Sequence, residues 1–484
     1  MFGWLMRFFP GGAATPVTAP APPRAPAAAL DTVTVTPDGV PSPAPAPSLA
    51  GGPLPGAAAA PMVAVPAPGT TASASGGALL RRTETLDREQ NLTGYAFELR
   101  EELTDRIRAP GRRVRDFVDG MLVEQIDRFG RGVALRGGTV CLRVWDGFLG
   151  QEVLGRLAGV PAILLVQPEM PASAASAELL GHLGRLRAAG LRIALDCNEP
   201  GPWLASLLPA ADAVVFRMGF CVPEEVVQFV RAIERVRPDV PVWAWEVGTL
   251  DDFELAREAG CAAFSGGFVV RRDDWKGNRL SPHGVRLASL LNRLRSGVDT
   301  HEIAAILKHD MALAYRLLRY VNAAAWGLNQ RITSVEQAIV VLGQQALQRW
   351  VSMMMMGSER TTPGAAVVLE AALVRARFLE LLGALRGERD PAAQLFVLGL
   401  FSMLDVALKV PIEDALRPLN LSEPMQDALL AQRGPMAPYL ELALALERGN
   451  AERIRAFAAV LNVDLGELNR LQFEALEWVK AAEA

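Results

Sequence analysis

The sequence predicts two folded domains of different class, an α/β barrel followed by an all-α domain. From about Arg82 to Lys276, short runs rich in Val, Ile, Leu and aromatic residues alternate with helical patterns. Such runs are typical of strands covered on both faces, and seven or eight βα units in succession close a TIM-type (β/α) barrel. After Leu280 the strand pattern ends, and the remaining residues carry helical periodicity.

The sequence predicts no folded domain before the barrel. Residues 11–81 are dominated by Ala and Pro, so we expect a disordered linker there. Residues 1–10, MFGWLMRFFP, are rich in aromatic side chains and lack the pattern of a secretory signal. This peptide is either a disordered tail or a docking segment for a partner or a membrane surface. We place the barrel at 82–277 and the helical domain at 278–484, with its core at 283–410.

The barrel strands are expected where apolar runs are bounded by turn residues. The candidates are TGYAFELR (93–100), TVCLRVW (139–145), AILLVQP (162–168), RIALD (192–196), AVVFRM (213–218), VWAWEV (242–247) and AAFSGGFVV (262–270). Helical patterns such as 176–190 and 223–238 lie between them.

In the second domain the helices are indicated by apolar spacing and by caps. Leu313, Leu317 and Val321 fall on one helix face, and Ser334 with Gln337 forms a capping box before a long helix. The SMMMM run at 352–356 is interpreted as core, with a partner-binding groove as the alternative. Further helices are expected at 391–408 and 465–483.

Composition excludes several classes of function. The net charge of −4 gives no overall attraction for nucleic acid, and the five arginines of RIRAPGRRVR (106–115) are flanked by acids, as on a solvated face. Four scattered cysteines without a CxxC pair fit a reducing cytosol. No apolar run approaches the ~18 residues of a membrane span. We therefore expect a cytoplasmic protein, with recruitment to a membrane or partner by residues 1–10 as an option.

Two stretches resemble known families. The order of GYAFELR, AILLVQPE, LRIALDCNEPG, AVVFRMGF, VWAWEVGTLDDFELAREAG and FSGGFVV resembles the EAL domain, a bacterial cyclic-di-GMP phosphodiesterase. Residues 306–350 resemble the HDOD domain. The succession of the two units is similar to that of the EAL-HDOD signalling proteins.

The resemblance implies a metal site whose ligand positions have changed in this chain. The family holds divalent metal through carboxylates and an asparagine at strand ends. Two of those oxygen ligands persist, at Glu169 and Asp196. The other motif positions are occupied by Ala96, Arg143, Cys197, Arg217, Trp245, Gly248 and Ser265.

From this ligand count we expect no catalytic residues, no metal, no cofactor and no enzyme activity. A register shift could bring Glu98 or Glu246 into the site, although a shift of one residue would turn the side chain to the other face. Arg100 matches an arginine that contacts substrate phosphate in the family. Arg143 and Arg217 either add contacts to a bound anion or, as we favour, form salt bridges with Glu169 and Asp196.

His309-Asp310 spells the signature of metal-dependent HD hydrolases. The four histidines of the chain are too few for such a metal cluster on several helices. We expect Asp310 to cap the helix that follows it, with His309 a neighbour by chance.

These observations predict a degenerate EAL-like barrel and an HDOD domain that act as a scaffold for protein–protein interaction in cyclic-di-GMP-linked regulation of motility or biofilm. The partner would bind the HDOD helices, and residues 1–10 are a second candidate contact. The alternatives are a cyclic-di-GMP sensor that does not hydrolyse its ligand and a residual phosphodiesterase.

Overall fold

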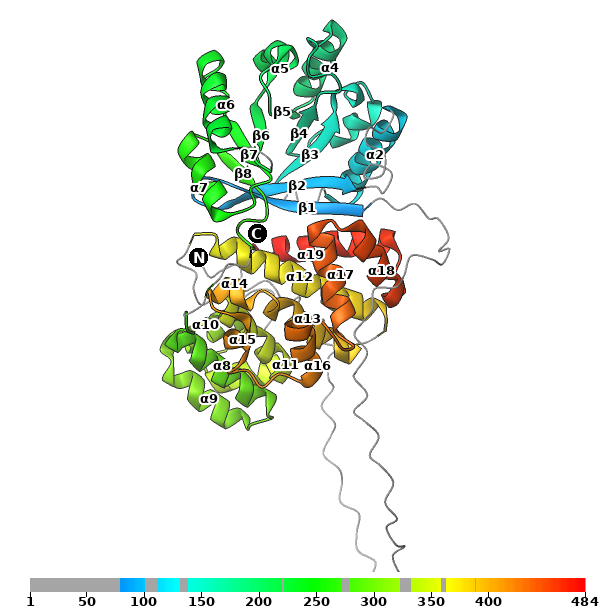
Figure 1. Cartoon of the computed structure of the whole chain (residues 1–484). Helices are drawn as coiled ribbons and strands as arrows, with labels where there is room; N and C mark the ends of the chain where they lie inside the picture. Colours follow the sequence, from blue (N-terminus) through cyan, green and yellow to red (C-terminus); the bar gives the residue numbers. More distant parts are fainter. Residues whose placement is uncertain are drawn as a thin grey trace, which may run out of the picture.

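The computed structural model describes residues 79–100, 112–130, 138–219, 222–271, 275, 278–322, 332–357, 363–387 and 389–483. It contains a closed eight-stranded barrel followed by a helical domain, as the sequence predicted (Figure 1). The strands are β1 (Leu79–Leu86), β2 (Leu92–Arg100), β3 (Thr139–Trp145), β4 (Ala162–Gln167), β5 (Arg192–Asp196), β6 (Ala213–Arg217), β7 (Val242–Trp245) and β8 (Ala263–Ser265). Residues 1–78, Arg106 and Arg108 lie outside the described part of the chain.

The helices of the barrel follow its strands. They are α2 (Arg112–Gln125), α4 (Ala177–Ala188), α5 (Pro202–Leu207), α6 (Pro223–Val236) and α7 (Leu250–Ala259), with the short turns η2 (Ile126–Gly130), η3 (Asp146–Phe148), η4 (Glu152–Leu157) and η5 (Leu208–Ala210). The helical domain comprises α8 (Pro282–Arg295), α9 (Thr300–His309), α10 (Met311–Val321), α11 (Val335–Met356), α12 (Ala365–Leu385), α13 (Arg389–Phe401), α14 (Leu404–Leu408), α15 (Ile412–Leu416), α16 (Glu423–Gln426), η7 (Asp427–Ala431), α17 (Ala437–Arg448), α18 (Ala451–Leu461) and α19 (Leu465–Glu483).

Strand β1 is the main departure from the expected barrel. It begins at Leu79, inside the segment expected to be linker, and runs antiparallel to both of its neighbours, β2 and β8. All other strand pairs are parallel. The last expected strand, 262–270, shortens to the three residues of β8 because the chain turns at Gly266 (φ 158°), where a Cβ atom would lie 2.1 Å from the carbonyl oxygen of Val247.

Alternate strand residues fill the inside of the barrel. A buried cluster of apolar side chains comprises Ala96, Cys141, Ile163, Leu165, Ala194, Ala213, Val215, Trp243 and Trp245. Because strand side chains alternate between faces, the residue two positions after such a member points inward at the carboxyl end of the same strand. On β2 to β6 the barrel mouth is therefore lined by the residues two positions after the last cluster member of each strand, which are Glu98, Arg143, Gln167, Asp196 and Arg217.

The sequence of helix α6 explains why it forms and packs on the outside of the barrel. Pro223 occupies its first turn with two glutamates, which suits the partial positive charge of a helix N-terminus. Val226, Phe229, Val230 and Ile233 recur at helical spacing and are buried against the barrel.

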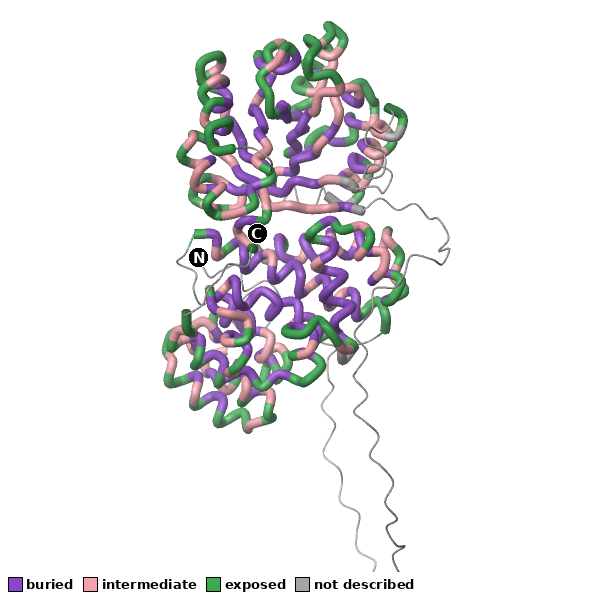
Figure 2. The backbone as a smooth tube through the Cα atoms, viewed as in Figure 1, coloured by how far each residue is buried: buried purple, intermediate pink, exposed green. Residues whose placement is uncertain are grey.

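The helical domain is built around α11, α12 and α13, whose buried residues form its centre (Figure 2). The Ser334 side chain accepts a hydrogen bond from the Gln337 N–H at 3.2 Å, which confirms the expected helix start. Met353, Met354, Met355 and Met356 are all at most 3% exposed. The methionine run is thus core, and the alternative of a partner-binding groove there is wrong.

The helical domain covers the outer face of β1 and β2 (Figure 1). Phe97 of β2 stacks on Phe473 of α19 at 5.5 Å between ring centroids. The Leu80 N–H donates to the Asn469 side chain at 3.2 Å, and the Lys480 ammonium lies over the Tyr95 ring. These buried contacts join the barrel and the helical domain into one packed unit.

In the part of the chain that the structure describes, no helix combines the length and the apolar character needed to cross a bilayer.

Candidate functional site at the barrel mouth

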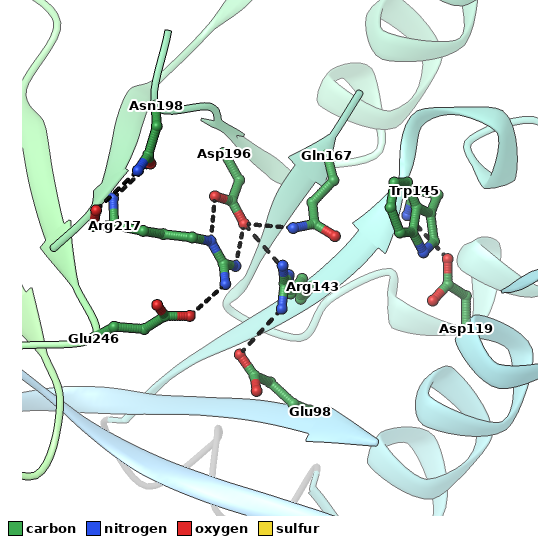
Figure 3. Close-up of polar contacts among 9 residues, drawn as sticks. All are labelled: Glu98, Asp119, Arg143, Trp145, Gln167, Asp196, Asn198, Arg217 and Glu246. Carbon is green, nitrogen blue, oxygen red and sulfur yellow. Dashed lines mark hydrogen bonds and ion pairs between the residues drawn. The ribbon is translucent and has the colours of Figure 1, made fainter. Parts of the chain in front are cut away.

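Asp196 lies at the centre of the barrel mouth, at the end of β5, and is 3% exposed. Its Oδ1 accepts from Arg217 Nε at 2.8 Å and its Oδ2 accepts from Arg217 Nη2 at 2.5 Å (Figure 3). Gln167 Nε2 donates to the same Oδ2 at 3.2 Å. The carboxylate is therefore held by a two-point contact with one guanidinium and by a neighbouring amide.

Two more carboxylates and a second arginine complete the barrel-mouth cluster. Arg143 Nε lies 3.5 Å from Asp196 Oδ2, and Arg143 Nη1 lies 3.9 Å from Glu98 Oε1. Arg217 Nη1 donates to Glu246 Oε1 at 2.6 Å. We use barrel-mouth cluster for Glu98, Arg143, Gln167, Asp196, Arg217 and Glu246. Each arginine bridges two carboxylates, so the charges in the cluster alternate (Figure 3).

Glu246 reaches the cluster through an unusual backbone conformation. It follows the end of β7 with φ at 60°, in the left-handed region that costs a non-glycine residue about 1 kcal/mol. The ion pair with Arg217 and the packing of the neighbouring Val247, which is fully buried, hold it there. Arg217 is fixed in turn at its backbone, where the Asn198 side chain accepts from its N–H and donates to its carbonyl oxygen.

Burial and charge act differently on the two arginines. Burial lowers the pKa of Arg143, and the like charge of Arg217 lowers it further. Burial also opposes the charge of Arg217, but the hydrogen bonds and charge of Asp196 outweigh it and raise the pKa of Arg217. Arg217 is thus the cation most strongly bound to Asp196.

Glu169 does not join the cluster. Its Oε1 accepts from Arg115 Nη2 of α2 at 3.0 Å, while its backbone N–H donates to Asp146. The expected salt bridges of Arg143 and Arg217 therefore form with Asp196 and not with Glu169. Arg115 belongs to the arginine-rich stretch that the sequence indicated only as a solvated face.

Asp119 of α2 is a second buried acid beside the mouth. Its Oδ2 accepts from the Trp145 N–H at 2.9 Å, at the end of β3. Burial raises the pKa of Asp119 to about 7, more than the Trp145 hydrogen bond lowers it. Sequence reasoning missed both Asp119 and Gln167; the spacing of Gln167 two residues after Leu165 was the available signal for its inward position.

The remaining motif positions have structural surroundings. Ala96 and Trp245 lie in the buried inner layer, where the Trp245 ring stacks on Trp243. Cys197 donates its S–H to the Glu199 carbonyl oxygen, and burial raises its pKa. The Gly248 carbonyl oxygen accepts from Arg271, and the Ser265 carbonyl oxygen accepts from the Val247 N–H. Arg100 ends β2, and its side chain lies outside the described structure.

The residues at the mouth do not fit a divalent metal ion. Mg²⁺ and Mn²⁺ need several carboxylate or carbonyl oxygens directed at one point. Here the oxygens of Asp196 face the two guanidinium groups, and Glu98 and Glu246 are turned toward the same arginines. A cation at this point would have to displace Arg143 or Arg217.

Asp310 caps helix α10, as the sequence predicted. Its Oδ1 accepts from the N–H groups of Ala312 and Leu313 at 3.1 and 3.0 Å. Those are the first free donors of a helix, so the aspartate of the apparent HD pair has a structural role.

Residues 283–420 match the family model of the HDOD domain. A relative from Vibrio cholerae serotype O1, cyclic di-GMP phosphodiesterase CdgJ, is 28% identical over 305 residues, which cover 62% of this chain and 70% of that protein. The chain thus resembles the EAL-HDOD proteins. The Bacillus subtilis protein YuxH is 28% identical over 238 residues, 49% of this chain and 58% of that protein.

Two solved structures are also similar to part of this chain. An EAL domain protein from Listeria monocytogenes is 14% identical, with a TM-score of 0.32, and the match covers 40% of this chain and 86% of that one. The PaMucR phosphodiesterase in complex with cyclic di-GMP is 18% identical, with a TM-score of 0.33, and the match covers 39% and 93%.

One expectation needs correction. The ligand count predicted that the chain is not an enzyme, but the Vibrio relative carries the name of a cyclic di-GMP phosphodiesterase. The prediction rested only on the ligand positions of the barrel.

Proposed function

We propose that this EAL-HDOD protein acts in cyclic-di-GMP-linked regulation by recognising a protein partner. The proposal rests on the ion pairs that Arg217 and Arg143 form with Asp196. Such a network of alternating charges ties the ends of β2, β3, β5, β6 and β7 together and gives the barrel a rigid mouth. A rigid barrel packed against the helical domain is suited to present one fixed surface.

The exposed apolar side chains of α10 and α11 support this role for the helical domain. Met311 and Tyr315 lie one helical turn apart on α10 and are 84% and 62% exposed, and Val340 of α11 is 73% exposed. Helices α10 and α11 contact each other. Exposed apolar patches mark protein interaction sites, and we propose that these side chains bind a protein with a complementary apolar helix face. A contact by residues 1–10 remains part of the proposal.

Hydrolysis of cyclic di-GMP is the second candidate function, favoured by the name of the Vibrio relative. Binding of cyclic di-GMP without hydrolysis is the third. In both cases the phosphates of the ligand would compete with Asp196 for Arg217 and Arg143.

Calorimetric titration of the full chain with cyclic di-GMP, with and without Mn²⁺, tests these functions together with chromatography of the products. Heat that does not need the metal, without product, would establish the binding function. Product formed by the wild type and lost in Asp196→Asn would establish hydrolysis and overturn the proposal. The absence of both supports recognition.

Affinity capture then tests the proposed surface. A protein retained by the wild type should be lost with the double variant Met311→Glu/Tyr315→Glu. Val236→Glu, at a 67% exposed position on α6 of the barrel, is the matched control and should retain it. Equal capture by all three proteins would contradict a partner site on α10.

A further inference from the structure

The helical domain contains a cavity that the proposed function does not use. It has a volume of about 480 Å³ and lies between α8, α11, α12, α13 and α16. We call it the helical cavity. Its size is in the range of small-molecule sites, and its lining combines apolar walls with a few charged and amide side chains.

Arg295, at the end of α8, supplies an unbalanced positive charge to the helical cavity. Its Nη1 is buried and has no hydrogen-bond partner among the described residues. Burial lowers the pKa of Arg295, which reflects the cost of a charge removed from water without compensation. An anionic group in the cavity would remove that cost.

The other charged residues of the wall do not compensate Arg295. Glu380 accepts from Arg349 Nη1 at 2.6 Å and Nη2 at 3.1 Å, and it also accepts from Arg377 Nη1 at 2.7 Å. Arg349 is further fixed by Phe396, whose ring centroid lies 3.5 Å from the guanidinium carbon. One carboxylate therefore already serves two arginines, and the charge of this wall is positive.

The backbone of α11 adds to the positive potential. Gly343, with φ 73° and ψ 169°, interrupts the helix, so a second helical segment begins at Gln344. Gln345 and Ala346, in its first turn, line the helical cavity. The first N–H groups of a helix carry partial positive charge and favour an anion.

The other residues that line the helical cavity suit an organic group that carries the anion. Leu291, Val397 and Met425 form apolar wall, and the amides of Gln345 and Gln394 can both donate and accept hydrogen bonds. Inorganic phosphate alone would leave most of 480 Å³ unfilled. A flat ring system with polar edges and one phosphate group matches the charge, the volume and the amides together.

We propose that the helical cavity binds a mononucleotide, with its phosphate on Arg295. The base lies against the apolar wall and its edges meet the glutamine amides. This site lies in the helical domain and is separate from the barrel mouth, so nucleotide binding here does not depend on the function proposed above.

Titration calorimetry of the full chain with AMP, with GMP and with inorganic phosphate tests the proposal. We expect at least one nucleotide to bind, and to bind more tightly than phosphate. Arg295→Gln should weaken that binding about tenfold or more, because a charge-assisted hydrogen bond is lost. Arg293→Gln, on the same helix but exposed and paired with Glu302, is the matched control and should bind as the wild type does.

A second variant tests the location without changing charge. Ala393→Phe places a ring in the helical cavity from α13 and should abolish nucleotide binding. Arg295→Gln removes an uncompensated cation and should keep the thermal stability of the wild type. The proposal is overturned if no nucleotide binds, if phosphate binds as tightly, or if Arg295→Gln binds unchanged. Repeating the cyclic-di-GMP titration with Arg295→Gln keeps binding here distinct from binding at the mouth.

Discussion

Replacing Asp196 by alanine should destabilise the protein by leaving two arginines without their shared partner. Asp196 is 3% exposed, and the side chains of Arg217 and Arg143 are 15% and 32% exposed. Removing one partner of a buried ion pair costs about 3–5 kcal/mol. Because solvent reaches Arg143 and Glu246 still neutralises Arg217, we expect about 3 kcal/mol, at the lower end of that range.

Urea unfolding followed by tryptophan fluorescence measures this effect. The double variant Asp196→Ala/Arg217→Met should lose less stability than the sum of the two single variants, by at least about 1 kcal/mol, since neither partner is then left unpaired. Asp239→Ala breaks an exposed ion pair with Arg237 and is the control that should leave the midpoint unchanged. An unchanged midpoint for Asp196→Ala, or strict additivity in the double variant, would refute the reasoning.

Three further predictions concern other parts of the chain. Asp119→Asn should match the wild type near pH 4 and become more stable as the pH rises to 7. The pKa of Asp119 is about 7 in the folded protein against an ordinary 3.8, so the folded wild type holds a proton that the unfolded chain has lost between pH 4 and 7. The free energy of unfolding of the wild type therefore falls by up to about 4 kcal/mol over that range. Urea unfolding at several pH values measures the difference between the two proteins. Phe473→Ala removes the stack on Phe97 and should cost about 3–5 kcal/mol, with barrel and helical domain melting separately in calorimetry; a single unshifted transition would contradict this. Asp310→Ala should lower the stability of the helical domain by about 1 kcal/mol in chemical unfolding, and Asp310→Asn, which keeps a cap, should restore most of it.

The barrel was predictable from sequence where its strands are covered on both faces. The runs at 162–168 and 213–218 are almost entirely apolar, which distinguishes them from helices with one polar side. Strand β1, LLRRTETL, was not predicted because it consists mostly of charged and polar residues with few apolar ones. Its outer face packs on α17 and α19, and no local pattern reveals a partner that follows hundreds of residues later.

The site was predictable in part: the ion pairs of Arg143 and Arg217 with Asp196 were expected, whereas Gln167 and the partner of Glu169 were not. Asp196, Arg143 and Arg217 were expected at strand ends, and their contact follows from the closed barrel. Glu98 enters the cluster because it lies two residues after Ala96 and so keeps the same face. The partner of Glu169, Arg115, comes from α2, and the position of that helix depends on packing that a single sequence does not show.

The hydrogen bond from Leu80 to Asn469 joins residues that are 389 positions apart, and it has a consequence for synthesis on the ribosome. The outer face of β1 and β2, with Phe97 on it, stays uncovered until α19 has left the exit tunnel. A nascent barrel therefore exposes the apolar side chains of this face, such as Phe97, while nearly two hundred further residues are translated. A stop codon placed before α19 should yield a chain that aggregates or is held by chaperones, although every strand of the barrel is present.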